Sequence, residues 1–353
     1  MTPRERIEAV FAGRRPDRVP VADTLHHAGL IEAVAGREGT VAERAWRAVA
    51  KVLDATPEGI LTGEARPTRA WNGWTLHCDK WSRWAEPPSP GPREDPVGWL
   101  RGLLEHDFDP LADLAEHVGE LTQECERVAP AIVWTSIAAP DFYPCSRLTH
   151  GPIGLGAAVT LFGLEGLTYL LADEPGLVSE FFELYTDTAL ARVAALPKEL
   201  PTRVFFVGED LAHRGGPLYA PDFLAREFFP RLARIVTAIH ARGDFVLYHS
   251  DGALEALLPQ LVEAGIDGLH PIEVDAGLTV PALRSAFPRL VLVGGIDCIR
   301  LLSRGTPEEV GEAVRRLVEV GGERYIAGAS GELHEAIPVE NGLAMLAALG
   351  RDG

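Results

Sequence analysis

Residues 244–270 read DFVLYHSDGALEALLPQLVEAGIDGLH and contain the repeating unit that decides the fold. The unit begins with the apolar run DFVLYH, continues through the polar turn SDG and a helical segment, and ends in a second apolar run. Short continuous runs of branched and aromatic residues are typical of parallel strands that are covered on both faces. The stretch therefore predicts a strand, a loop, a helix and a second strand parallel to the first.

The same unit recurs along the chain, which contains eight apolar runs with the strand pattern. The predicted strands are residues 18–21, 59–62, 131–135, 203–207, 244–249, 266–270, 290–293 and 324–327. Strand, loop and helix repeated in this way favour an α/β fold of the (β/α)8 TIM barrel type, with an open doubly wound sheet as the alternative. Neither a GxGxxG nor a GxxxxGK[ST] motif is present, so we expect no NAD and no ATP cofactor.

Helix signals between the strands agree with this pattern. Residues 220–242 form the longest helical segment. Thr306 is followed by Pro307 and then Glu309, which is the order of an N-cap, a first-turn proline and a capping-box glutamate. Because residues 2–5 read TPRE and have the same order, we expect helices to begin at both threonines.

A long segment after the second predicted strand differs in composition from the rest of the chain. Residues 64–129 contain five of the seven tryptophans: Trp71, Trp74, Trp81, Trp84 and Trp99. We predict one barrel domain over residues 1–353, with residues 64–129 as a capping insertion at its mouth. The indoles either pack the insertion onto the barrel or stack on a flat ligand.

The charge and the cysteines exclude several classes of protein. The chain has 33 basic and 51 acidic residues and a net charge of −18, which argues against nonspecific binding to nucleic acid or to an anionic membrane. The first residues lack the apolar stretch of a signal peptide, and we expect no later run to approach the roughly 18 apolar residues of a membrane span. The expected location is cytoplasmic. Cys78, Cys125, Cys145 and Cys298 form no CxxC pair, so neither a disulfide framework nor a thiolate zinc ribbon is indicated.

Polar side chains gather where the predicted strands end, which is where a barrel builds its active site. They are Glu64, Glu209, Asp210, His249, Asp251, His270, Glu273, Asp297, Cys298, Ser330, Glu332 and His334. Any one of them alone would be a loop cap or a turn former. Because carboxylates that converge on one pocket repel, we expect some to be neutral, some to pair with His249 or Arg214, or some to bind a cation.

His249 and Asp251 stand two residues apart, so their side chains face the same side of an extended segment. Imidazole and carboxylate together suit zinc or another first-row divalent ion, and Glu209, Glu273 or His270 could complete the set of ligands. The alternative is a hydrogen-bonded His–Asp pair used for general acid–base chemistry or only for structure. His26, His27, His213 and His240 are weaker candidates, and His240 is interpreted as a helix-end residue.

At these residues the chain resembles the uroporphyrinogen decarboxylase superfamily, which also contains cobalamin-linked methyltransferases. The resemblance is carried by residues 4–21 (RERIEAVFAGRRPDRVPV), 150–175, 207–232, 247–273, 292–310 and 337–341 (IPVEN). It implies a (β/α)8 barrel with its site at the C-terminal mouth.

The chain departs from the signatures of two branches of this superfamily, the decarboxylases and the zinc methyltransferases. The decarboxylases carry an arginine-containing loop after the first strand, where this chain reads DTLHHAGL over residues 23–30, so a porphyrinogen substrate is disfavoured. They also have an aspartate after the second strand, approximately at Glu64, and a histidine after the eighth, near Gly331. The zinc methyltransferases use His-x-Cys after the fifth strand and a second cysteine after the eighth, whereas this chain has His249 with Asp251 and then Ser330-Gly331.

The leading hypothesis is a superfamily enzyme that transfers or removes a methyl group on a small substrate, with a corrinoid protein as methyl acceptor. His249, Asp251 and Glu273 are the predicted metal ligands, for zinc or another divalent ion, and His249, Asp251, Asp210 and Glu209 are the predicted catalytic residues. The predicted substrate-binding residues are Glu64, Arg214, His270, Glu273, Asp297 and His334. One alternative is a decarboxylase in which Asp210 or Glu64 stabilises a protonated intermediate and Arg214 holds a carboxylate. Another is a noncatalytic member that binds a tetrapyrrole or a corrinoid protein, and a homodimer is compatible with each.

Overall fold

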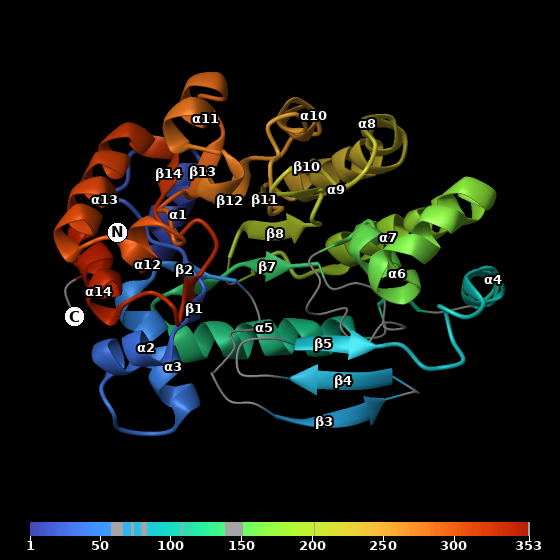
Figure 1. Cartoon of the computed structure of the whole chain (residues 1–353), viewed down its shortest axis with the longest axis horizontal. Coiled ribbons are helices and arrows are strands. Elements are labelled where there is room, and N and C mark those ends of the chain that lie inside the picture. Colours follow the sequence, from blue (N-terminus) through green and yellow to red (C-terminus); the bar gives the residue numbers. More distant parts are fainter. Residues whose placement is uncertain are drawn as a thin grey trace.

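Short parallel strands lie at the centre of the protein and helices surround them (Figure 1). The computed structural model describes residues 1–57, 66–71, 74–78, 83–106, 109–111, 113–137, 151–200 and 202–351. The central strands are β2 (Ala55–Thr56), β6 (Ile132–Val133), β7 (Thr135–Ser136), β8 (Val204–Gly208), β11 (Phe245–His249), β12 (Gly268–Ile272), β13 (Val291–Gly294) and β14 (Tyr325–Ile326). The chain therefore has the α/β fold with parallel strands that the sequence predicts.

The strand pairings return to their starting point. Parallel pairs join β7 to β8, β8 to β11, β11 to β12, β12 to β13 and β13 to β14, and a further parallel pair joins β2 to β6. Parallel bridges join Ala22 to Ala55 and Val21 to Ala327. The segment at residues 21–22 thus lies between the second strand and the last, as the first strand of a closed ring does. This order differs from that of an open doubly wound sheet.

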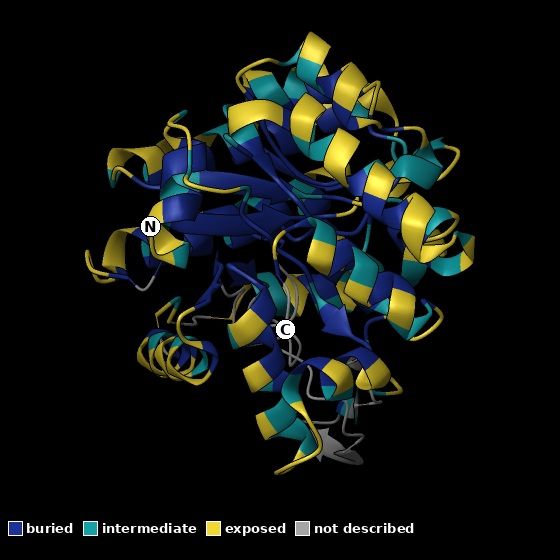
Figure 2. Cartoon of the chain, turned by 90° about the vertical axis from the view of Figure 1, so that its left-hand side faces the viewer, coloured by how far each residue is buried: buried dark blue, intermediate teal, exposed yellow. Residues whose placement is uncertain are grey.

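Helices surround this ring on its outer face and, in the case of α1, at one end, and their exposed sides are turned to solvent while the strands are buried (Figure 2). They are α1 (Pro3–Phe11), α2 (Ala28–Ala35), α3 (Val41–Val52), α4 (Pro96–Leu104), α5 (Leu114–Val128), α6 (Leu155–Asp173), α7 (Pro175–Ala195), α8 (Pro221–Phe223), η1 (Leu224–Phe228), α9 (Phe229–Ala241), α10 (Leu258–Glu263), η2 (Val274–Ala276), α11 (Val280–Ala286), α12 (Leu301–Arg304), α13 (Pro307–Gly321), η3 (Gly322–Arg324) and α14 (Val339–Ala348). Thr2 and Thr306 form the predicted capping boxes of α1 and α13. The predicted helix 220–242 corresponds to α8, η1 and α9, with η1 a π-helical turn.

The protein has two apolar cores, one inside the ring of strands and one between the strands and the surrounding helices. Alternate residues of several strands, such as Val204 and Phe206 of β8, form the inner core, and the residues between them pack outward against the helices. One end of the inner core is closed by α1, whose Ile7, Val10 and Phe11 belong to it. The polar side chains at the carboxyl ends of the strands therefore lie at the other end, the barrel mouth.

Two predictions about the elements need correction, that of the second strand and that of a chain without a membrane-length apolar run. The second strand is β2, at Ala55–Thr56, whereas the predicted residues 59–62 lie outside the described residues. Within residues 64–129 the described parts contain α4, α5 and an antiparallel sheet of β3 (Arg66–Trp71), β4 (Trp74–Cys78) and β5 (Arg83–Glu86). Helix α6 is long and apolar enough to cross a membrane by length and composition, contrary to the expectation that no such run exists. Its Leu161, Phe162 and Leu167 are buried in the outer core, whereas its Leu164 and Tyr169 are exposed.

Two small two-stranded sheets lie beside the ring. β1 (Leu25–His26) pairs in parallel with β15 (Leu333–His334), and β9 (Ala212–His213) forms a hairpin with β10 (Gly216–Pro217). Among the tryptophans of the insertion, Trp74 is buried and Trp99 packs edge-on against Phe162 of α6 at 5.9 Å. These two indoles contribute to packing, and whether residues 64–129 cap the mouth stays a prediction.

Candidate functional site

Two histidines lie at the inner side of the barrel mouth because of strand alternation. Phe245 and Leu247 of β11 pack in or against the inner core, and His249 follows with the same parity at the carboxyl end of the strand. On the next strand, β12, His270 is the register partner of His249. The two imidazoles therefore come from neighbouring strands and face the same interior.

The imidazoles of His249 and His270 contact each other, and both contact the ring of Phe206. Their Nδ1 atoms are 2.9 Å apart, and their ring centroids are 5.2 Å apart. The ring of Phe206, from β8, lies 5.3 Å from His249 and 5.4 Å from His270, measured between centroids. Close approach of β8 to this pair requires Gly208, because a Cβ there would lie 2.6 Å from the Cβ of His249.

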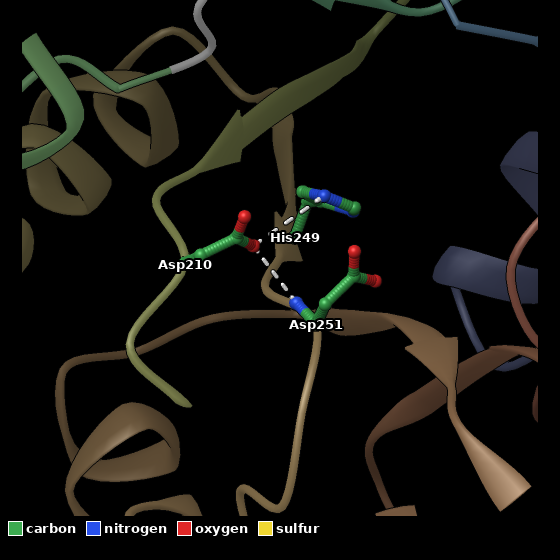
Figure 3. A group of neighbouring side chains, drawn as sticks. All are labelled: Asp210, His249 and Asp251. Atoms are coloured by element: carbon green, nitrogen blue, oxygen red, sulfur yellow. Dashed lines mark hydrogen bonds and ion pairs between the residues drawn. The ribbon is translucent and has the colours of Figure 1, made fainter. Parts of the chain in front are cut away.

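Two aspartates complete a group with His249 (Figure 3). Asp210 follows β8 and Asp251 follows β11, and one carboxylate oxygen from each, together with a ring nitrogen of His249, lies within 4.8 Å of the others. Asp210 Oδ1 is 3.8 Å from His249 Nε2 and accepts a hydrogen bond of 2.9 Å from the backbone N–H of Asp251. Asp210 therefore fixes the segment that carries Asp251 as well as facing the imidazole.

The electrostatics of the group favour a bound cation or a shared proton. Desolvation in the mouth raises the pKa of Asp251, His249 opposes this, and the charges of Asp210 and Glu332 add to it. Desolvation also raises the pKa of Glu273, whose Oε2 accepts the backbone N–H of Gly252 at 2.6 Å. Gly252 has a φ of +94°, so the segment after Asp251 is a turn that Glu273 holds in place. A positive ion would relieve the repulsion between these carboxylates.

Glu209 lies outside this group even though Asp210 follows it directly. Its buried carboxylate accepts 2.8 Å hydrogen bonds from the backbone N–H groups of Ile153, Gly154 and Gly156, at the start of α6. Burial raises the pKa of Glu209 to about 7, and these N–H donors oppose that rise. The contacts are those of a helix N-terminal cap. They place Glu209 in the wall of the barrel, so its predicted catalytic role has no support from the geometry.

Arg214 and Asp297 belong to an ion-pair network at the rim. Arg214, in the β9–β10 hairpin, lies 3.2 Å from Asp275 of η2, and Arg300 lies 3.0 Å from Asp297 and 3.7 Å from Asp275. Oδ1 of Asp297 also accepts hydrogen bonds from the backbone N–H groups of Ile299 and Arg300. These contacts are those of a residue that caps its own loop. Asp275 and Arg300 were not predicted, because nothing in their local sequence indicates which loops meet.

A second histidine–carboxylate pair comes from β1 and the segment before β15. His26 Nδ1 lies 2.7 Å from Glu332, and this hydrogen bond lowers the pKa of Glu332. His334, the register partner of His26, accepts the N–H of Ala336 on its Nδ1. The sequence indicated Glu332 and His334 only as strand-end residues, and the parallel pairing of β1 with β15 is what brings His26 to them.

The remaining candidates have structural contacts or lie outside the described residues. Glu64 is among the latter. His27 caps α2 by accepting the N–H of Leu30, and His240 lies in the last turn of α9 and bonds to Asp267, as a helix-end histidine does. The Cys298 thiol is buried beside Ser330, and burial raises its pKa.

One residue that the sequence prediction missed is Asp23, which follows the first strand. It is buried and accepts backbone N–H groups from Thr24 and Ala329. Burial raises its pKa to about 7. Asp23 therefore ties the first strand to the last near Glu332, and its position directly after the first strand was the only local signal.

Comparison with known proteins agrees with the fold and with the resemblance. A family model described as uroporphyrinogen decarboxylase (URO-D) matches residues 107–351, more than half of the chain. No curated protein matches the chain. A solved structure of a methyltransferase from Methanosarcina mazei is 17% identical with a TM-score of 0.65, over 99% of this chain and 98% of that one. A structure from Listeria monocytogenes, described as a candidate vitamin-B12 independent methionine synthase, is 11% identical with a TM-score of 0.45, over 95% of this chain and 96% of that one. At 17% identity the first of these shows a shared fold.

Proposed function

The chain belongs to the uroporphyrinogen decarboxylase family, and we propose that it is an enzyme that removes or transfers a methyl group on a small substrate. We place the reaction at the mouth of a (β/α)8 barrel, with a divalent ion held by His249, Asp210 and Asp251. The observation that carries the proposal is the convergence of these three donors, from the ends of two neighbouring strands, within 4.8 Å of one another. The fold of the Methanosarcina methyltransferase supports the reaction class by analogy.

The donors fit a first-row divalent ion. Zinc–nitrogen and zinc–oxygen bonds are about 2.0–2.2 Å long, so two donors on one ion lie at most about 4.3 Å apart. The 3.8 Å between His249 Nε2 and Asp210 Oδ1 is within this limit, and the third donor needs only a small side-chain rotation. The group has no thiolate, since Cys298 lies beside Ser330 instead. Imidazole with carboxylate suits zinc, manganese or iron, and it favours activation of an oxygen or nitrogen centre over a thiol.

The residues of the chain have separate tasks in this proposal. His249, Asp210 and Asp251 would hold the ion, which supplies a Lewis acid that polarises the oxygen or nitrogen from which the methyl group leaves. Asp210 also orients Asp251 through the backbone N–H of that residue. Glu273, predicted as a ligand, would instead fix the Gly252 turn, because its Oε2 is bonded to the Gly252 N–H. A corrinoid protein is the proposed methyl acceptor, and the cytoplasm is the proposed location.

A decarboxylase acting on a small acid is the second candidate, and the rim arginines favour it. Arg214 and Arg300 both pair with Asp275, and both side chains are more than half exposed. A substrate carboxylate at the mouth could take the place of Asp275 on either guanidinium. Release of carbon dioxide from small carboxylic acids tests this candidate, and an Arg214→Ala variant should then raise the KM for the acid.

Metal analysis of protein purified without chelator tests the leading proposal. We expect one equivalent of a divalent ion in the wild type, loss of that ion in His249→Ala, and retention in His240→Ala. His240 is the matched control, because it is a carboxylate-paired histidine outside the mouth. Methyl transfer from methoxy or methylamine compounds to a corrinoid acceptor should follow the ion content. Metal-free wild-type protein, with His249→Ala folded and no different from it, would contradict the proposal.

A further inference from the structure

The contact between His249 and His270 restricts where the two rings carry their protons. A neutral imidazole has one N–H and one bare nitrogen. Nitrogen atoms 2.9 Å apart form a hydrogen bond only if one of them carries the hydrogen and the other is bare. Because both contacting atoms are Nδ1, two neutral rings must differ, one being the Nδ1–H tautomer and the other the Nε2–H tautomer.

The two uses of His249 considered above require opposite arrangements. Its Nε2 faces Asp210 Oδ1 at 3.8 Å. If His249 were an acid–base partner of Asp210, Nε2 would carry the hydrogen and His270 would donate to His249. If Nε2 is an ion ligand, it must be bare, and then His249 Nδ1–H donates to His270. The direction of one hydrogen bond therefore distinguishes the two chemistries.

We propose that His270 is a positioning residue that accepts the Nδ1–H of His249 and so presents the bare Nε2 of His249 to the ion. This inference rests on the proposed function, and it changes the predicted role of His270 from substrate binding to orientation of a ligand. The backbone supports it, because His249 and His270 are register partners on parallel strands and Phe206 packs against both rings. The ring of His249 is thereby held in orientation as well as in tautomer. Hydrogen bonds of this kind hold most metal-binding histidines.

Two substitutions at residue 270 separate the hydrogen bond from packing. In His270→Asn the side-chain oxygen can occupy the place of Nδ1 and accept from His249. His270→Leu has nearly the same shape as Asn but has no acceptor. We expect His270→Leu to bind Zn²⁺ or Co²⁺ about 10–100-fold more weakly than the wild type, and His270→Asn to stay within a few-fold of it. The visible spectrum of bound Co²⁺ should be retained in His270→Asn and altered in His270→Leu.

The tautomer itself is measurable without metal. In metal-free wild-type protein with ¹⁵N-labelled histidine, at about pH 8, we expect His249 to be protonated at Nδ1 and His270 at Nε2. Protonation of His249 at Nε2 would overturn the inference. So would equal ion affinity and equal Co²⁺ spectra in wild type and His270→Leu, and in that case the metal centre would stand. A wild type that binds neither ion would instead overturn the proposed function, and this inference with it.

Discussion

Glu209 provides a sharp test of how the barrel wall is built, because its neighbours make the cost of changing it calculable. One carboxylate oxygen accepts the N–H groups of Ile153 and Gly154, and the other accepts that of Gly156. Glu209→Gln keeps the first oxygen and replaces the second with an NH₂ group that cannot accept. Glu209→Ala removes both acceptors.

The expected losses follow from the number of N–H groups left without a partner. Each buried unsatisfied donor costs about 1–3 kcal/mol. At about pH 5.5, where Glu209 is mostly protonated, Glu209→Gln should lower the free energy of unfolding by about 1–3 kcal/mol, and Glu209→Ala should lower it by at least about 3 kcal/mol. Because neither residue 209 nor α6 contributes to the donor group, the ion affinity of Glu209→Gln should stay within a few-fold of wild type.

The pH dependence gives the prediction a second, independent part. The pKa of Glu209 is raised from 4.5 to about 7 in the folded protein, so its stabilising contribution is complete below about pH 4.5 and declines as the pH rises through 7. The difference between the two pKa values corresponds to about 3 kcal/mol. Since glutamine does not titrate, the deficit of Glu209→Gln should shrink by about 2 kcal/mol between pH 5.5 and 8, because that interval covers about 1.5 of the 2.5 pH units between the two pKa values.

Urea unfolding followed by far-ultraviolet circular dichroism at both pH values measures these quantities. A Glu209→Gln variant that is as stable as wild type at pH 5.5, or whose deficit does not change with pH, would refute the reasoning about the α6 cap. A folded and stable Glu209→Gln that has lost its ion would restore the catalytic role predicted from the sequence.

The other predictions concern the mouth, a buried acid and a helix end. Gly208→Ala would bring a Cβ to 2.6 Å from the Cβ of His249, so β8 must shift. We expect the free energy of unfolding, measured in urea, to fall by about 1–3 kcal/mol, and ion binding, measured by calorimetry, to weaken. Unchanged ion affinity would contradict this. The pKa of Asp23 is raised from 3.8 to about 7, so Asp23→Asn should remove a decline in stability of up to about 3 kcal/mol between pH 4 and 7, and an unchanged pH profile would count against the burial argument. Thr306→Ala removes the N-cap of α13 and should cost about 1 kcal/mol, whereas no loss would mean that the capping box contributes nothing.

Local sequence predicts those parts of the fold that a local pattern determines. The runs RVFFV and DFVLYH locate β8 and β11 to within one residue, because buried parallel strands require continuous apolar sequence. The second strand is only Ala55–Thr56, which is too short to show an apolar run. The strand pattern in the sequence therefore indicates the nearby residues 59–62 instead. Helix α6 packs one side in the outer core but also carries exposed apolar residues, among them Leu164 and Tyr169, and composition alone cannot tell such a helix from a membrane segment.

The candidate site was predictable in its residue types but not in its contacts. Strand ends are visible in sequence, and they correctly placed His249, Asp210 and Asp251 at one end of the barrel. Glu209 and Asp210 are adjacent and chemically alike, and only the arrival of the α6 N-terminus, more than fifty residues earlier in the chain, assigns them different surroundings. The pairing of His249 with His270 depends on strand register, which is a property of the closed ring.

Titration of Co²⁺ into metal-stripped protein tests the central claim, that His249, Asp210 and Asp251 form one ion-binding centre, most directly. We predict one equivalent bound by the wild type and by the Glu209→Gln control. His249→Ala, Asp210→Asn and Asp251→Asn should each bind at least about tenfold more weakly, since even the outer contacts of a metal site contribute that much. Folded wild-type protein that binds no Co²⁺, or three variants that bind it as well as the wild type does, would contradict the claim.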